Sequence, residues 1–527
     1  MRATGAVLLG AAALAAMGFG GGPADRSLAE AERLAAGPAR EPARERFTLN
    51  GVVIDGVSVY SRTELAPLYA DFLAREVGMG ELAAIAQAVT DKYRADGYFL
   101  ARAVAPPQTD PAGLARIQVY EGYVDDLAFA GAAVPAVGGL LQDIVEHRPL
   151  RLSTLDRRLA LANDLPGVRV SAQVEPDLDD PARHRLVVTT VLDRFEGQAY
   201  GDNRGGERAG PWQVYSRGAL NSAVRPGDQI SAGLLTTPSD PKRFTQLDAA
   251  YVHPLPTGGS MRLGLAASEA RDSTDGVAAT LGNRSQSASL RLTHPLVRGQ
   301  DRSLWLVGAV DARRSEQDWG ARRGVDELLV ARLGGQGHLN SAAGQSTLSI
   351  QASYGLGGFG GEPRDGRSRA DADARFWKLN LAASHYRDLG QKAGLFLSAS
   401  GQWSPDALLA SEEFAAGGLP VGRAYDYAEI MGDKGVGGLA ELRVGWDPNL
   451  RPMTFFQTYG FMDVAQVWND GVAPGWRSAS LAAAGAGVRR GFWPALRGGA
   501  GAPKPPPPTP VHPGRGWRGF LSLSSAF

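Results

Sequence analysis

Residues 348–354, Leu-Ser-Ile-Gln-Ala-Ser-Tyr, alternate strictly between apolar and polar side chains. Successive side chains of a β-strand point to opposite faces, so this segment has one apolar face and one wettable face. The same alternation recurs in residues 262–268, 289–293 and 377–384, with Gly, Asp, Asn or Pro in the segments between. From Phe195 onward the pattern therefore predicts a long antiparallel sheet joined by hairpin turns.

The composition indicates where such a sheet is stable. Of 527 residues 68 are glycine, about 13% against an ordinary usage of roughly 7%. Charged residues make up 21%, and 55 Lys+Arg balance 55 Asp+Glu. Few charges and many turn glycines are typical of a membrane β-barrel. Zero net charge argues against a nucleic-acid binder, and the absence of cysteine excludes disulfides, thiolate metal sites and a cysteine nucleophile.

The barrel is expected to be large and closed. About 330 residues follow residue 194, enough for an even strand number in the mid-teens, and we expect 16. A soluble β-sandwich also alternates, but the run of hairpins is too long for one sandwich. Proline cannot donate to a strand ladder, so the Pro-rich segment 500–513 implies either a penultimate strand at 488–496 or an altered closure.

The last strand ends the chain on an aromatic residue. Leu521, Leu523 and Phe527 fall on one face. This resembles the C-terminal strand of bacterial outer-membrane proteins, whose last residue is read by the barrel-assembly machinery.

The N-terminus is predicted to be an export signal. Residues 1–24 combine a basic start, a short apolar run and small residues at a possible cleavage site. Residues 25–46 are predicted to form a short helix and a polar linker. No later stretch approaches the roughly 20 apolar residues that a spanning helix needs.

Two small α+β units are expected between the linker and the barrel, at residues 47–124 and 125–194. In the first, the pattern predicts strands at 52–59, 99–105 and 115–121 and helices at 61–72 and 81–96. The second repeats the strand–helix–helix–strand–strand order, with a helix from Ser153 and strands at 168–174 and 185–192.

Both units contain short motifs at fixed places. The first has Tyr93, Arg94, Gly97, Tyr98, Pro107, Gln108, Glu121 and Gly122. The second has Asn163, Leu165, Pro166 and Gly167, after the run Leu155-Asp156-Arg157-Arg158. In these motifs the units resemble the two POTRA domains of two-partner secretion transporters, the ShlB/FhaC/HecB haemolysin secretion and activation family.

The resemblance extends to an inward-folded loop, expected at residues 411–438. Its tip matches the family motif at Arg423 and Tyr425, followed by Asp426, while Ala424 replaces the usual glycine. A strand motif of the inner wall matches at Phe461 and Asp463, with Ala465 again for glycine. The family pattern implies that Arg423 and Asp463 latch the loop in the pore, so Asp463→Ala is expected to impair secretion. The alternative is that Arg423 is a solvated loop residue.

The function implied by the resemblance is export of an unfolded exoprotein. The barrel would lie in the bacterial outer membrane with its POTRA domains in the periplasm, and act as a monomer without a cofactor. The POTRA domains would capture an exoprotein bearing an N-terminal two-partner secretion domain by strand addition. Residues 26–36 would plug the resting pore. The alternatives are a barrel-assembly insertase of the same superfamily or a passive porin.

Nothing in the sequence indicates an enzyme. The seven histidines are isolated, so no metal site is expected, and no nucleophile-elbow or Walker A motif occurs. We interpret the glycine string at 355–360 as a loop, and the pair Glu412-Glu413 as a solvated turn.

Overall fold

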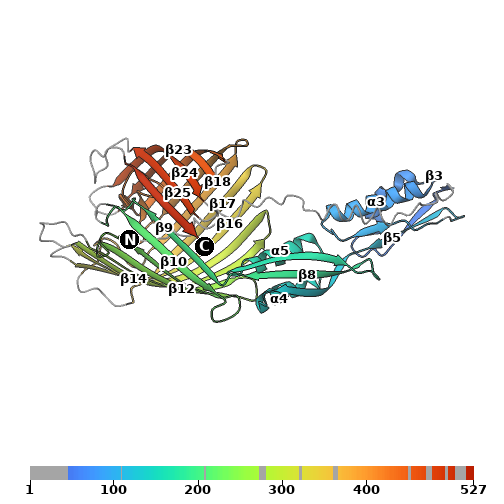
Figure 1. Ribbon diagram of the computed structural model, residues 1–527, viewed down its shortest axis with the longest axis horizontal. Helices are drawn as coiled ribbons and strands as arrows, with labels where there is room; N and C mark the ends of the chain where they lie inside the picture. Colours follow the sequence, from blue (N-terminus) through green and yellow to red (C-terminus); the bar gives the residue numbers. More distant parts are fainter. Residues whose placement is uncertain are drawn as a thin grey trace.

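The computed structural model describes residues 46–108, 110–206, 209–271, 281–319, 323–359, 366–448, 453–470, 477–492, 496–504 and 518–527. The predicted export signal and the predicted plug helix lie outside these residues. Two small domains extend one after the other from one end of a barrel (Figure 1). We name them domain 1, up to Gly122, and domain 2, residues 123–194.

Domain 1 has the predicted strand–helix–helix–strand–strand order. Its main sheet has the order β2-β5-β4, in which β2 and β5 are parallel. Its elements are β1 (Phe47–Thr48), β2 (Gly51–Asp55), α2 (Arg62–Leu65), the 3₁₀ turns η2 (Ala66–Leu68) and η3 (Ala70–Phe72), β3 (Glu76–Val77), α3 (Met79–Ala95), β4 (Arg102–Val104) and β5 (Leu114–Tyr120). Helix α3 buries Leu82, Ile85, Val89 and Tyr93, the side chains that the sequence periodicity selected.

Three predicted elements of domain 1 are too long. Strand β2 stops at Asp55 because Gly56 turns the chain at φ 79°. The helix predicted over 61–72 breaks after Leu65, since Pro67 has no N–H to continue it. Strand β4 covers only 102–104, because Phe99 and Leu100 pack against the core of domain 2 instead.

Domain 2 repeats the plan in a sheet of order β6-β8-β7. Its elements are β6 (Tyr123–Gly131), α4 (Pro135–Leu141), η4 (Gln142–Ile144), α5 (Leu152–Asn163), β7 (Val168–Pro176) and β8 (Arg183–Leu192). The boundary predicted after residue 124 falls inside β6, which starts two residues earlier.

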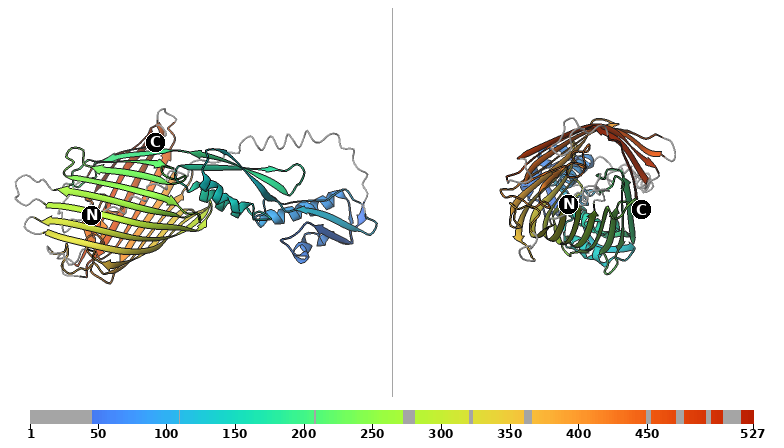
Figure 2. Two further views of the ribbon diagram at one scale, coloured as in Figure 1. Left: turned by 90° about the horizontal axis from the view of Figure 1, so that it is seen from below. Right: turned by 90° about the vertical axis from the view of Figure 1, so that its left-hand side faces the viewer.

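The barrel closes with 16 antiparallel strands, as the alternating pattern predicts. They are β9 (Phe195–Asp202), β10 (Gln213–Asn221), β11 (Gln229–Thr236), β12 (Phe244–Pro254), β13 (Ser260–Arg271), β14 (Leu281–Arg298), β15 (Arg302–Trp319), β16 (Arg323–Ser341), β17 (Gly344–Gly357), β18 (Trp377–Asp388), β19 (Ala393–Trp403), β22 (Lys434–Trp446), β23 (Met453–Trp468), β24 (Ser478–Phe492), β25 (Leu496–Lys504) and β26 (Phe520–Ala526). Seen from the end away from the domains, the strands enclose an interior (Figure 2, right).

The apolar residues of the alternating segments face outward. Leu348, Ile350 and Tyr354 of β17 are about half exposed, at 54%, 47% and 52%. Such a face is costly in water but stable in lipid. Among the described residues, no helix is both long and apolar enough to cross a membrane.

The penultimate strand differs from both expectations. Strand β25 runs from Leu496 to Lys504 and includes Pro503, whereas the predicted strand at 488–496 overlaps the end of β24 and the first residue of β25. Pro503 is tolerated because it lies near the end of β25, beyond Gly501, the last residue that pairs with β26. The interpretation of the glycine string at 355–360 as a loop is also wrong for its first half, since residues 355–357 belong to β17.

Candidate functional site

The connection between β19 and β22 is a long loop, residues 404–433, that lies against the inner face of the barrel. A short hairpin, β20 (Phe414–Ala416) with β21 (Ile430–Gly432), divides it into a stem and a tip of residues 417–429. The range predicted for the loop was wrong at its far end, since residues 434–438 are part of β22.

Glycines let the tip reverse direction. Gly417, Gly418 and Gly422 have φ of 119°, 76° and 93°, a region that side chains disfavour. Ala424 is not among the residues with positive φ, and its methyl group is fully buried. The alanine at this position is therefore compatible with the fold of the tip.

The tip packs on small residues of the barrel wall. Tyr425 is only 3% exposed and joins Val421 and Ala424 in an apolar cluster. The facing side chains on β23 and β24 are Ala465, Val467, Ala479, Leu481 and Ala483. Because several of these are alanines, the wall is shallow enough to admit a tyrosine ring.

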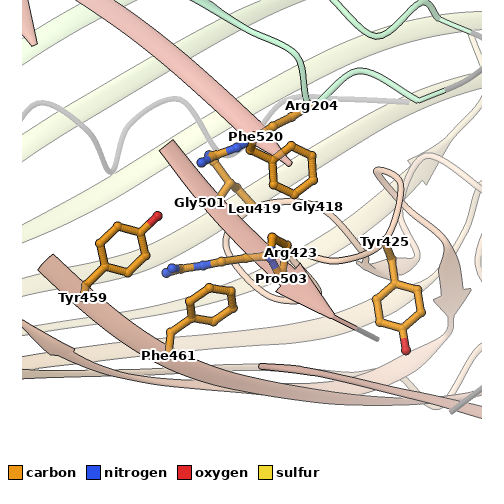
Figure 3. Close-up of a pocket in the computed structure, with 10 residues that line it drawn as sticks. All are labelled: Arg204, Gly418, Leu419, Arg423, Tyr425, Tyr459, Phe461, Gly501, Pro503 and Phe520. Carbon is orange, nitrogen blue, oxygen red and sulfur yellow. The ribbon is translucent and has the colours of Figure 1, made fainter. Parts of the chain in front are cut away.

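Arg423 extends from the tip between Tyr459 and Phe461 (Figure 3). Its Nη1 donates to Glu441 Oε2 at 2.6 Å, and the guanidinium carbon lies 4.4 Å from the centre of the Phe461 ring. This arginine is mostly buried, with a side chain 13% exposed. The alternative of a solvated loop residue is therefore wrong.

The predicted Arg423–Asp463 pair takes a different form. Asp463 accepts backbone N–H groups, from Gly422 at 3.1 Å and from Arg423 at 3.4 Å. Its Oδ2 lies 3.9 Å from Arg423 Nε, too far for a hydrogen bond. Asp463 thus holds the backbone of the tip, while Glu441 binds the guanidinium.

Glu441 is a site residue that sequence reasoning missed. Its side chain is fully buried, and it accepts bonds from Arg423, Arg443 at 2.7 Å and Arg489 at 2.8 Å. Arg489 also lies 4.1 Å from the centre of the Tyr459 ring. The partners of Glu441 could not be identified from the sequence, because its position beside Phe461 follows from the pairing of β22 with β23.

The tip also reaches the start of the last strand. Asp426 pairs with Arg518 at 2.8 Å, directly before β26. The tip and the neighbouring wall enclose a cavity of about 20 Å³ lined by the ten residues of Figure 3. One short segment therefore contacts both β23–β24 and the strands where the barrel closes.

The stem has a separate set of buried charges. Glu412 binds Arg332 at 2.8 Å and Lys378 at 2.8 Å, and Arg332 also binds Asp311 at 2.6 Å. The interpretation of Glu412-Glu413 as a solvated turn is wrong, since Glu412 is 3% exposed. Paired in this way, the charges offset the cost of leaving water.

A second stem cluster surrounds Arg369. Its guanidinium binds Asp433 at 2.7 Å, Glu413 at 2.6 Å and Asp371 at 2.8 Å. Asp433 also accepts the backbone N–H of Leu408 at 2.7 Å. This cluster therefore joins the stem to the connection between β17 and β18, through ionic contacts that do not involve the tip.

The motif of domain 1 contains a buried tyrosine network. The Tyr93 hydroxyl donates to Glu121 Oε1 at 2.6 Å, and the same carboxylate accepts the backbone N–H of Ser58 at 2.8 Å and of Val59 at 3.2 Å. Burial and the bond to Glu121 raise the pKa of Tyr93. Tyr60 stacks edge-on against Tyr93 at 4.8 Å.

Other residues of that motif lie at the junction between the domains. Gly97 ends α3 at φ 91°, and Tyr98 is 6% exposed. A Cβ on Gly122 would lie 2.3 Å from Leu100 Cβ, so only glycine fits there. Arg94 and Pro107 are exposed. Gln108 bonds the backbone N–H and carbonyl of Arg116, both at 2.7 Å.

The motif of domain 2 connects α5 to the barrel. Asn163 bonds Val170 through both side-chain atoms, and Leu165 is buried in the core. Gly167 has φ 68°, and a Cβ there would lie 2.2 Å from Asn221 Nδ2 at the end of β10. Pro166 lines a cavity between domain 2 and the barrel rim.

The C-terminal residues lie as predicted from their alternation. Leu521 and Leu523 are each 54% exposed on the outer face, and Phe527 is 71% exposed. The Phe527 backbone pairs with Gly197 in both directions, at 2.6 and 2.8 Å. The terminal residue thus takes part in barrel closure.

Among the described residues, no group of three or more His, Asp or Glu could hold a metal ion.

Two protein-family models match the chain. Residues 186–490, more than half of the chain, match the family model of the haemolysin secretion/activation protein ShlB/FhaC/HecB. Residues 47–122 match the model of the ShlB-type POTRA domain.

Individual relatives cover most of the chain. The outer membrane transporter CdiB of Escherichia coli is 25% identical over 410 residues, 74% of this chain and 67% of that protein. The heme/hemopexin transporter protein HuxB of Haemophilus influenzae is 22% identical over 387 residues, 71% and 67% of the two chains. The solved structure of CdiB from Escherichia coli matches with a TM-score of 0.75 over 96% of this chain and 99% of that one, at 21% identity, which supports the fold.

Proposed function

The chain belongs to the ShlB/FhaC/HecB haemolysin secretion/activation family, and we propose on that premise that it exports one unfolded exoprotein through its barrel lumen. It is an outer-membrane two-partner secretion transporter, with domains 1 and 2 in the periplasm. Members of the family are transporters rather than enzymes, and they work with a secreted exoprotein.

One observation supports the proposal most directly. The lumen of the barrel contains a loop whose tip is held by one small apolar cluster and by a few polar contacts, among them Arg423 with Glu441 and Asp463 with a backbone N–H group. Polar contacts can be exchanged for contacts with water or with a passing chain at small net cost. A loop attached in this way can be displaced without unfolding the barrel.

The partners proposed below are those that the family resemblance implies. The cargo would bear an N-terminal two-partner secretion domain, captured by domains 1 and 2. Leu521, Leu523 and Phe527 would be read by the barrel-assembly machinery, and the outer face would contact outer-membrane lipid around a monomer. Residues 1–24 would direct export, and residues 26–36 would plug the resting pore.

The test is secretion of an exoprotein that bears an N-terminal two-partner secretion domain. Arg423→Ala should lower the amount of exoprotein at the cell surface, because without its contact with Glu441 the tip is no longer held in a defined position on the wall before the chain arrives. Arg262→Ala, on the lumenal face of β13, is the matched control and should secrete normally. Equal secretion by both variants and the unchanged protein would contradict the proposed role of the tip. Failure of the unchanged protein to export would contradict the function itself.

A further inference from the structure

Helix α5 of domain 2 contacts domain 1 at its N-terminal end. The Arg151 guanidinium, just before the helix, donates to the Tyr98 hydroxyl at 2.7 Å and lies 4.7 Å from the centre of its ring. The N–H of Leu152 donates to the Gly97 carbonyl at 2.9 Å, and that of Leu150 to the Gly122 carbonyl at 3.0 Å. The motif residues of domain 1 thus bind the start of α5.

Apolar packing reinforces the same junction. Phe99 and Leu100 follow α3 in domain 1, yet they pack against the buried core of domain 2. Only Glu121 and Gly122 separate β5 from β6. A two-residue connection cannot act as a free hinge when its glycine touches Leu100 and its carbonyl is bonded.

The other end of α5 contacts the barrel. Arg298, at the end of β14, binds Asp164 through two parallel bonds of 2.8 and 2.7 Å. Arg157 donates to the carbonyls of Leu296 and Pro295, each at 3.2 Å. The barrel partners of α5 therefore come from the end of β14, at the rim that faces the domains (Figure 2, left).

Further close contacts join domain 2 to neighbouring turns of the rim. A Cβ on Gly227, in the turn after β10, would lie 3.4 Å from Ala136 Cβ on α4. A Cβ on Gly258, in the turn after β12, would lie 2.8 Å from Leu161 on α5. Only Asp193 and Arg194 separate β8 from β9. Domain 2 therefore cannot swing from the rim without breaking contacts at three separate turns.

We propose that α5 is a rigid strut that fixes domain 1 relative to the periplasmic mouth of the barrel, with Arg151, Asp164 and Arg298 as its positioning residues. The helix has 12 residues and is about 18 Å long at 1.5 Å per residue, and an α-helix of that length is stiff. Domains within one chain move relative to one another by default, so contacts at both ends of one helix are informative.

The consequence for export rests on the proposed function. An exoprotein segment held by domain 1 is presented at a constant distance and orientation from the pore. The effective concentration of a tethered segment at a site depends on the distance that the tether must span. A fixed distance between domain 1 and the pore therefore lets the bound exoprotein segment find the entrance faster. The strut therefore determines how efficiently captured cargo enters the barrel.

The first test locks domain 2 to the rim. The natural chain has no cysteine, so Ala136→Cys with Gly227→Cys gives a single possible disulfide, and a Cβ separation of 3.4 Å is close to the 3.5–4.5 Å that disulfides need. We expect equal secretion from the oxidised and the reduced double variant. Secretion lost on oxidation and restored by reduction would overturn the proposal, because domain 2 would then have to leave the rim.

The second test breaks the strut. Spin labels at Asp91→Cys on α3 and Ala342→Cys in the turn after β16 report the distance between domain 1 and the rim. Arg298→Ala should broaden this distance distribution and lower secretion, as should Arg151→Ala. Arg185→Ala, which removes an ion pair with Asp126 inside domain 2, is the control and should do neither.

Rescue separates positioning from a general structural effect. In the Arg298→Ala background, the oxidised Ala136→Cys/Gly227→Cys pair should restore secretion, and reduction should abolish the rescue. A broadened distribution with unchanged secretion, or a failed rescue, would refute the strut. Loss of secretion in every protein, including the unchanged one, would instead count against the proposed function.

Discussion

Glu441 is the point at which three arginine side chains converge on one carboxylate. Arg423 from the loop tip, Arg443 from its own strand and Arg489 from β24 all bind it, and its side chain is fully buried. Hydrogen bonds that involve ions are roughly twice as strong as neutral ones. Of the three bonds only that from Arg423 reaches the tip, but it joins two charged groups, whereas Asp463 accepts from neutral backbone N–H groups. We therefore expect the attachment of the tip to depend more on Glu441 than on Asp463.

Replacing the carboxylate tests this order. Glu441→Gln keeps the shape of the side chain but removes the charge, and should weaken tip attachment by about 1.5–3 kcal/mol, the range for hydrogen bonds to charged groups. Protease cleavage within residues 417–429 of the purified protein should become faster. Asp463→Asn is the comparison and should cause a smaller increase. A larger increase in cleavage for Asp463→Asn would show that Asp463 contributes more than Glu441 to the attachment of the tip.

Tyr93 makes domain 1 sensitive to alkaline pH. Because burial and the Glu121 bond raise its pKa, the unfolded chain loses this proton at lower pH than the folded one. The stability that protonated Tyr93 adds to the folded domain is complete below the ordinary tyrosine pKa of about 10. It is lost as the pH rises beyond that value. Hydrogen exchange of α3 should accelerate above that pH. In Tyr93→Phe the protection should be lower at neutral pH and depend less on pH; an unchanged pH dependence would assign the effect to another group.

At the scale of elements, the sequence predicts those helices and strands whose side-chain pattern repeats over neighbouring residues. The alternation in β17 and the helical spacing in α3 come from neighbouring residues, so both predictions are confirmed. Strand β4 is shorter than predicted because Phe99 and Leu100 pack against the core of domain 2. A local sequence pattern carries no information about such a contact with another domain.

The candidate site divides in the same way. Arg423 and Tyr425 could be found from the tip motif, which is a contiguous string. Glu441 could not be assigned a partner, because its position beside Phe461 follows from the pairing of β22 with β23. The stem contact of Glu412 with Arg332 joins residues 80 positions apart, and charge alone does not select that pair.

The stem should behave as an independent, strongly coupled element. Arg332→Met leaves Glu412 with Lys378 as an ionic partner. Either Arg332→Met or Glu412→Gln alone should therefore lower the free energy of unfolding markedly, while adding the second substitution to the first should lower it less. We expect a coupling free energy of about 1 kcal/mol or more between Arg332→Met and Glu412→Gln, within the range for residues in one network. Urea unfolding of the barrel in lipid vesicles measures it. Additive effects would show that the two residues do not stabilise the stem jointly.

For the whole molecule, a disulfide that locks the loop tip to the wall and one that locks domain 2 to the rim should have opposite effects on secretion. At the tip, a Cβ on Gly437 would lie 3.6 Å from Val421 Cβ, within the disulfide range. Oxidised Val421→Cys/Gly437→Cys should block secretion and lower single-channel conductance, and reduction should restore both, because the tip must leave the wall for a chain to pass. The lock between domain 2 and the rim should leave secretion intact in the same assay. If the tip lock permits export, the cargo path does not require the tip to move, and the polar attachment of the loop is structural rather than a latch.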